Sequence, residues 1–353
     1  MSTASGGGVP DFIRRFSVLI AFFWLGLAVV TNVFVPQLET VAESHNVSLS
    51  PHDAPSLQAS KQIGKVFQEF DSDSSAMIVL EGDQPLGAEA HHYYDGLVQK
   101  LSEDTKHVEH IDNFWGDPLT AAGSQSADGK AALVQVYLAG NQGESLANES
   151  VDAVRDIVNH TPPPSGLKVY VTGAAPLVTD QFEVGRHGTL KTTLITLGVI
   201  AVMLFWLYRR LTTVFFVIFT VMIELTASRG VVAVLANAGI IELSTYSTNL
   251  LTLLVIAAGT DYAIFLLGRF HEARYAGQDR VSAFNTMYHG TAHIILGSGL
   301  TIAGAVLCLT FTRLPYFQSL GVPAGTGVLV AVVAALTLAP ALLVIGRHFG
   351  LFE

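Results

Sequence analysis

The stretch that decides the fold is Asn249–Gly268, which reads NLLTLLVIAAGTDYAIFLLG. Its length and apolar character predict a membrane-spanning helix, because about 20 such residues cross the hydrocarbon core of a bilayer. Asp261 stands inside this stretch and is followed by Tyr262. A carboxyl group near the bilayer centre costs about 2.5–3.5 kcal/mol, so this residue indicates an ion pathway, a proton relay or a paired structural site.

The composition of the whole chain agrees with a membrane protein. Half of the 353 residues are hydrophobic, 14% are charged, and the mean hydropathy is +0.46. These values are typical of an integral membrane protein. The net charge of −10 argues against a nucleic-acid partner, because phosphate binding needs a basic surface. With Cys308 as its only cysteine, the chain must fold without an internal disulfide.

Apolar segments of about 20 residues predict six transmembrane helices. The segments are 16–36, 189–208, 211–235, 248–268, 290–311 and 319–345. The resulting domain plan has five parts. They are a cytoplasmic tail (1–15), a first transmembrane helix (16–36), an extracytoplasmic domain (37–188), transmembrane helices two to six (189–346) and a cytoplasmic end (347–353).

The distribution of arginine predicts how the chain is oriented. Arginines at both ends of the helical region and in every second connection fall on one side: Arg14, Arg15, Arg209, Arg210, Arg269, Arg274, Arg280 and Arg347. The short loops of the opposite side carry only Arg313. The positive-inside rule therefore places both termini in the cytoplasm and the large segment outside the cell membrane, in the periplasm.

The extracytoplasmic segment alternates strand and helix patterns. An amphipathic helix is predicted over 56–70, with Ile63, Val66, Phe67 and Phe70 at helical spacing. Strand patterns follow at 76–80, 108–114, 132–138 and 167–171, and helix patterns lie near 93–101 and 145–159. The order β-α-β-β-α-β is that of a ferredoxin-like fold. The predicted fold class is thus a polytopic bundle of six transmembrane helices with a ferredoxin-like α+β domain.

Reversible protonation is the chemistry that Asp261 offers. Desolvation within a membrane favours the neutral form of a carboxyl group, and the phenol of Tyr262 is both a donor and an acceptor. Adjacent residues on a helix point about 100° apart, so the two side chains address different neighbours. We predict a proton relay at Asp261 and Tyr262. The alternative is that Asp261 is a neutral acid hydrogen-bonded for packing.

Three further polar residues are candidates for a polar network around Asp261. Glu224 lies in the third predicted helix, and Ser298 and Thr301 lie in the fifth. Structural hydrogen bonding for Glu224 and simple helix packing for Ser298 and Thr301 remain alternatives. Arg229 lies about 140° around the helix from Glu224, so we expect it to extend outward rather than to pair with that residue.

The sequence predicts no metal site and no cofactor. His91, His92, His107 and His110 lack the ligand set that a metal needs. The run GVPAGTG at 321–327 lacks the Lys-Ser/Thr ending of a phosphate loop and falls in a predicted membrane helix.

Several stretches carry a family resemblance. They are GTDYAIFLLGRF at 259–270 with Glu272-Ala273-Arg274, DSDS at 71–74, WGDPLTA at 115–121, LAGNQG at 138–143 and LGSGLTIAG at 296–304. Together they resemble the mycobacterial membrane protein large (MmpL) family of the resistance–nodulation–division superfamily, especially its siderophore and drug exporter branch. The resemblance implies a secondary transporter driven by the proton-motive force. The Asp261–Tyr262 pair would carry protons, and an external porter domain would handle a lipidic or amphiphilic substrate such as a siderophore, a lipid or a drug.

The resemblance also raises the question of partners. Family members have two homologous halves of six helices, each with its own porter domain and Asp-Tyr pair, and this sequence carries one. A second polypeptide supplies the other half, or two copies associate, or the chain is a fragment that does not transport. The family further implies trimers and a small periplasmic accessory protein.

Two rival functions belong to other classes. An intramembrane aspartyl protease needs two aspartates that share a proton, and the predicted helices offer only Asp261. Helices two to six also resemble the five-helix sterol-sensing unit of the wider superfamily. This second likeness implies a lipid-binding module that does not transport.

Overall fold

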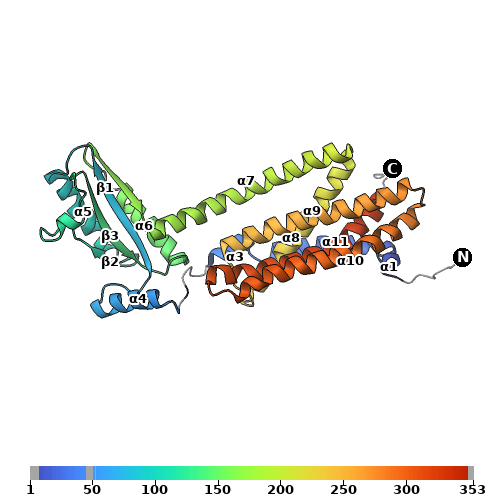
Figure 1. Ribbon diagram of the computed structural model, residues 1–353, viewed down its shortest axis with the longest axis horizontal. Coiled ribbons are helices and arrows are strands. Elements are labelled where there is room, and N and C mark those ends of the chain that lie inside the picture. The colour runs from blue at the N-terminus through green and yellow to red at the C-terminus, as the bar shows by residue number, and fades with distance from the viewer. Residues whose placement is uncertain (1–7, 45–50, 52, 349–353) are drawn as a thin grey trace. The chain divides into compact units, whose positions relative to one another are not determined.

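The computed structural model describes residues 8–44, 51 and 53–348, which belong to two compact units (Figure 1). The helical unit comprises Met1–Glu43, Gly185–Thr312 and Phe317–Glu353. The sheet unit comprises Ser44–Val184 together with Arg313–Tyr316.

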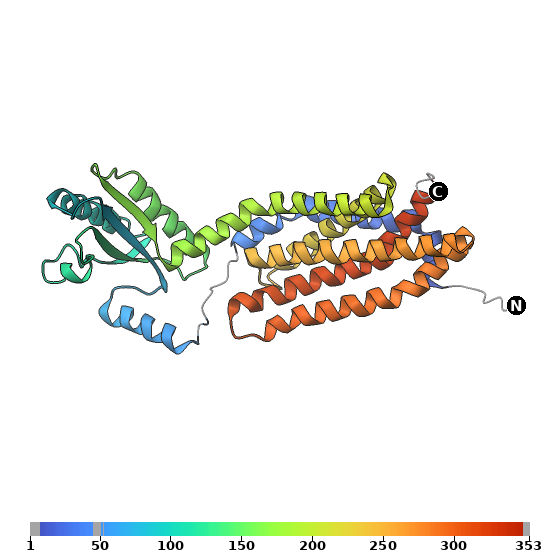
Figure 2. The same cartoon turned by 45° about the horizontal axis from the view of Figure 1, so that its top comes forward.

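Among the described residues, six helices are long and apolar enough to cross a membrane, which confirms the predicted number. They are α2 (Ser17–Phe34), α7 (Ala174–Tyr208), α8 (Leu211–Asn237), α9 (Thr245–Tyr275), α10 (Arg280–Leu307) and α11 (Pro315–His348). Figure 2 shows that the long helices of the helical unit run roughly along one axis. Two short helices, α1 (Val9–Arg15) and α3 (Leu38–Ser44), flank α2. The short 3₁₀ turn η2 (Cys308–Phe311) follows α10 and carries the exposed thiol of Cys308.

The fifth membrane helix begins ten residues earlier than its hydropathy predicts, at Arg280 instead of 290. Asp279 caps it by accepting hydrogen bonds from the backbone N–H groups of Val281 (3.0 Å) and Ser282 (3.4 Å). The same bonds, with one from the Ser282 hydroxyl, lower the pKa of Asp279. A side-chain cap satisfies orphan N–H groups regardless of hydropathy, so it extends the helix beyond its apolar part.

The core of the helical unit is formed by α8, α9 and α11, whose spans are the most buried, whereas those of α7 and α10 are the least. A separate cluster joins α2 to α8 and α11. Its fully packed members are Trp24, Ala28, Ile223, Ala227, Ala334 and Leu338. The indole N–H of Trp24 also donates to the hydroxyl of Thr337 (3.0 Å), so α2 is tied to α11 by a polar contact as well.

The sheet unit contains four strands in the order β2-β3-β1-β4, and every neighbouring pair is antiparallel. The strands are β1 (Ser74–Gly82), β2 (Val108–Asp112), β3 (Ala131–Leu138) and β4 (Leu167–Thr172). Helix α5 (Ala88–Glu103) joins β1 to β2, and α6 (Ser145–Asn159) joins β3 to β4. A short 3₁₀ turn, η1 (Ala121–Gly123), precedes β3, and α4 (Pro55–Phe67) precedes β1. The chain order is therefore β-α-β-β-α-β.

One face of the sheet forms the core of this unit together with α5 and α6. Alternate residues of β1 and β3 are fully buried, among them Ile78 and Val136, as the two-residue period of a strand requires. Leu97 of α5 and Val154 of α6 are also fully buried. Burial raises the pKa of the Tyr94 phenol on α5 to about 12.

The amphipathic helix predicted over 56–70 is shorter than expected, and its apolar face is not packed by the described residues. Helix α4 ends at Phe67 because Gln68 takes a left-handed backbone conformation (φ 58°). Phe70 then leaves the helix and stacks on Tyr137 with ring centroids 4.0 Å apart. Ile63, Val66 and Phe67 are 54%, 68% and 67% exposed, so the described residues do not cover the apolar side of this helix.

Truncation of Leu97 should destabilise the sheet unit, because its side chain is fully buried in the core. Leu97→Ala is expected to cost about 2–5 kcal/mol. The measurement is urea unfolding followed by the fluorescence of Trp115, which is buried in the same core. Leu119→Ala is the matched control, because Leu119 is 92% exposed. Equal midpoints for the two variants would contradict this core.

Candidate functional site

The most buried ionisable group of the helical unit is Glu224 on α8. Its side chain is fully buried, and neither carboxyl oxygen has a hydrogen-bond partner among the described residues. The carboxyl group lies directly against the backbone of Gly259 on α9, where an added Cβ would overlap one of its oxygens. The sequence places a glycine where the carboxyl group of a neighbouring helix needs room.

Tyr262 lies one turn after Gly259 on α9, and residues three apart share a helix face. Its side chain is 6% exposed, and its hydroxyl points toward α10, 3.2 Å from the position of a Cβ at Gly299. Ser298 is close to this hydroxyl. No described residue, however, makes a hydrogen bond of acceptable geometry with it.

Thr260 adds a third buried polar group, a hydroxyl without a hydrogen-bond partner among the described residues. We call Glu224, Thr260 and Tyr262 the unsatisfied polar cluster. Buried polar atoms are almost always paired, and an unpaired one costs several kcal/mol in hydrocarbon. Sequence reasoning missed Thr260, because a threonine in a membrane helix usually bonds to a backbone carbonyl of its own helix.

Asp261 differs from its neighbours in the direction of its side chain. The sequence predicts a carboxyl group shut inside the bundle, but Asp261 is exposed on the surface of this chain. Ser298 and Thr301 on α10 are exposed as well, and Thr301 donates to the carbonyl of Gly297 on its own helix (2.8 Å). No hydroxyl of the described residues donates a hydrogen bond to Asp261. The buried Glu224 and Tyr262 form an inward set, and the exposed Asp261, Ser298 and Thr301 form an outward set. The two sets adjoin where Ser298 lies close to the Tyr262 hydroxyl.

Arg229 is held in place by two partners. Its guanidinium forms an ion pair with Glu39 of α3 and donates to the hydroxyl of Thr252 on α9 (3.0 Å). As expected, Arg229 does not pair with Glu224, whose carboxyl oxygens have no partner among the described residues. The pairing lowers the cost of an arginine within a membrane helix and joins α3, α8 and α9.

Residues 48–353 match the MMPL family, and the match includes the unsatisfied polar cluster and Asp261. The chain belongs to the MMPL family. It is 59% identical to the probable transport protein MmpL2 of Mycobacterium tuberculosis and 56% identical to the probable transport protein MmpL4 of Mycobacterium leprae. It is 57% identical to the siderophore exporter MmpL5 of Mycobacterium tuberculosis.

The matches cover nearly all of this MMPL-family chain but only part of each relative. They include 97–98% of the chain and 36% of each of these three proteins. The chain therefore spans about a third of the length of these curated relatives.

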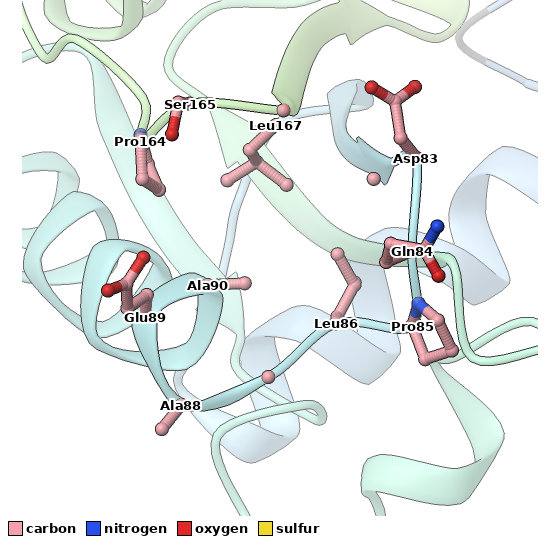
Figure 3. A pocket seen from close by; sticks show the side chains of 13 residues that line it. Asp83, Gln84, Pro85, Leu86, Ala88, Glu89, Ala90, Pro164, Ser165 and Leu167 are labelled. Atoms are coloured by element: carbon pink, nitrogen blue, oxygen red, sulfur yellow. The ribbon is translucent and has the colours of Figure 1, made fainter.

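A hollow of about 360 Å³ lies in the sheet unit of this MMPL-family chain, where β1, α5 and β4 meet (Figure 3). Leu86, Ala90 and Leu167 lie between Glu89 on one side and Asp83 on the other. In the described ranges, no group of three or more histidine, cysteine or acidic side chains is placed to hold a metal ion.

Substitution of Gly259 should disturb the site through the carboxyl group of Glu224. In Gly259→Ala the new methyl group overlaps that carboxyl group, and overpacking of this kind costs roughly 1–3 kcal/mol. The control is Gly297→Ala on α10, where an added Cβ meets no atom within 4 Å. The measurement is the thermal stability of the detergent-solubilised chain.

The double variant Gly259→Ala/Glu224→Ala removes the overlapping group and should recover part of the loss. Equal stability of Gly259→Ala and Gly297→Ala would contradict the close approach of α8 and α9 at Gly259.

Proposed function

We propose that this chain forms half of a proton-motive-force-driven exporter of lipidic or amphiphilic molecules. Asp261 and Tyr262 form its proton relay, and Glu224 belongs to the same network. The proposal rests on one observation above the others, the unsatisfied polar cluster beside Asp261 within the membrane-spanning helices.

Unpaired polar atoms give this cluster a role that packing alone does not explain. A carboxyl group used only for structure would be hydrogen-bonded, whereas both oxygens of Glu224 have no partner among the described residues. Groups left without partners are free to bond to a proton carrier. Each proton that moves down 100 mV releases about 2.3 kcal/mol, which is enough to bias a conformational equilibrium.

A second transporter half, or a second copy of this chain, is the proposed partner of the outward set. Asp261 cannot remain exposed to hydrocarbon without cost, so a facing helix must supply its partner. Gly297 and Gly304 lie on the exposed side of α10 near Ser298 and Thr301, and small residues let membrane helices approach closely. The trimer and the small periplasmic accessory protein are proposed from the family resemblance alone.

The sheet unit is proposed to be the external porter domain. Its strand order β2-β3-β1-β4 and its chain order β-α-β-β-α-β are those of a ferredoxin-like fold. The arginine distribution supports an orientation with both termini in the cytoplasm and this unit in the periplasm. Helix α7 supports coupling of the porter domain to the membrane helices, because its residues pass without interruption from the sheet unit into the helical unit.

The proposed substrate class follows from a relative. One protein of 57% identity is named a siderophore exporter, which favours a siderophore, and a lipid or an amphiphilic drug fits the same class.

Infrared difference spectroscopy on the chain in liposomes tests the relay. An imposed pH gradient should change the carboxyl C=O band of Asp261, and Asp261→Asn should remove this change. Glu272→Gln is the matched control, because Glu272 is 65% exposed and pairs with Arg269 at the surface. Glu224→Gln should remove a separate carboxyl band if Glu224 belongs to the network.

If the carboxyl band of Asp261 does not change under the pH gradient, the proposal of proton-driven export is contradicted. If the same preparation still binds lipid, the chain is the sterol-sensing-like module, and if it binds none, it is an inactive fragment. The substrate class is tested by measuring siderophore export from cells that naturally produce the chain. Export by the unchanged chain is compared with export by the Asp261→Asn variant.

A further inference from the structure

A groove runs along the contact between α2 and α8, on an exposed side of the helical unit. Its volume is about 460 Å³. It is lined by Leu25, Ala28, Val29, Asn32 and Val33 of α2 and by Phe219, Met222, Ile223 and Thr226 of α8. Val29 and Val33 are 59% and 69% exposed, so the described residues leave the groove open along its length. Its walls are apolar except for the polar groups of Asn32 and Thr226.

A small polar pocket continues the groove at the end where α2 gives way to α3. Its volume is about 110 Å³. It is lined by Thr31, Asn32, Pro36, Gln37, Leu38 and Glu39 on one side and by Arg229, Gly230 and Ala233 of α8 on the other. Arg229 and Glu39 face each other here as an ion pair.

Asn32 lines both hollows, so the apolar groove and the polar pocket meet at its side chain. Its amide nitrogen donates to the carbonyls of Ala28 (2.8 Å) and Thr226 (3.4 Å). Both bonds use the nitrogen, so the amide oxygen can accept a hydrogen bond from a ligand.

The lining residues of α8 show that the groove and the polar pocket lie along one line of contact between α2 and α8, which we call the α2–α8 seam. They recur at intervals of three or four residues from Phe219 to Ala233, which keeps them on one side of the helix. Thr31 packs so closely on Gly230 that an added Cβ would overlap it. This contact holds α2 and α8 together at the polar end. Beyond it, the longer side chains of the two helices leave a space between them, which is the groove.

We propose that the α2–α8 seam binds a membrane amphiphile with one acyl chain and a small, uncharged, hydroxyl-bearing head. The acyl chain lies in the apolar groove, which covers about 10 Å of α8 between Phe219 and Thr226 at 1.5 Å per residue. The head lies in the polar pocket. Its volume equals that of about four water molecules at ~30 Å³ each, which limits the head to the size of a glycerol group.

The ion pair selects an uncharged head. Glu39 already balances the charge of Arg229, so an anionic head would have to displace Glu39 and would meet its repulsion. A hydroxyl group can accept from the remaining N–H groups of the guanidinium and donate to the carboxylate without breaking the pair. The amide of Gln37 provides a further donor and acceptor for hydroxyl groups. The amide oxygen of Asn32 and the hydroxyl oxygen of Thr31 are further acceptors, because the Asn32 nitrogen and the Thr31 hydroxyl proton already donate to backbone carbonyls.

The test is photolabelling of the chain in phosphatidylcholine nanodiscs with a monoacylglycerol that carries a diazirine on its acyl chain. Adducts mapped by mass spectrometry are expected on α2 between Leu25 and Val33 and on α8 between Phe219 and Thr226. Met222→Trp fills the groove and should reduce this labelling roughly tenfold, the effect of about 1.4 kcal/mol. Met203→Trp is the matched control, because Met203 is exposed on α7 and lies outside the groove.

The head is tested with two more comparisons. Asn32→Ala should weaken labelling by the monoacylglycerol, and an anionic lysophosphatidic acid with the same diazirine chain should label the seam less than the monoacylglycerol does. Labelling spread evenly over all lipid-facing helices, or unchanged in Met222→Trp, would overturn the site. Equal labelling by the anionic probe would overturn the assignment of the head. No pH gradient is applied, so these results do not depend on the proposed proton relay.

Discussion

The helical unit depends on the cost of placing a carboxyl group in hydrocarbon without a partner. Glu224 lies fully buried against the bare backbone of Gly259, and its carboxyl oxygens have no hydrogen-bond partner among the described residues. A side chain at Gly259 would force α8 and α9 apart, and these two helices form much of the unit's core. Tyr262 lies one turn after Gly259 on α9 and is close enough to Glu224 to sense its charge.

Two acidic residues on neighbouring helices therefore have opposite environments. Glu224 points into the bundle, while Asp261 lies on a surface that the described residues do not cover. A carboxyl group enclosed by its own chain is shielded whatever else is present, whereas the surroundings of Asp261 are set by whatever packs on α9 and α10. The outward carboxyl is therefore open to contacts from beyond the described residues, and the inward one is closed to them.

The sequence predicted what depends on local composition. Six apolar segments gave six candidate spans, and the strand patterns at 76–80 and 132–138 located β1 and β3. Helix ends were predicted less well, because they depend on single residues. Asp279 extends α10 by capping it, and the left-handed backbone of Gln68 ends α4.

The candidate site was predicted only in part, because its contacts join residues far apart in the chain. Asp261 and Glu224 stand out as acids in apolar segments, but hydropathy does not say which way either side chain points. The ion pair between Glu39 and Arg229 joins residues 190 positions apart, so no local sequence pattern predicts it. Thr260 is distinctive only because no neighbour satisfies it, which becomes visible once α8 and α9 are packed.

Cys308 gives the chain a practical property. It is the only cysteine in the sequence, and its thiol is exposed in η2, between α10 and α11. A maleimide dye or a nitroxide would therefore attach at one defined position without any engineered substitution. Distances measured from that label would follow the end of α10 in the natural sequence.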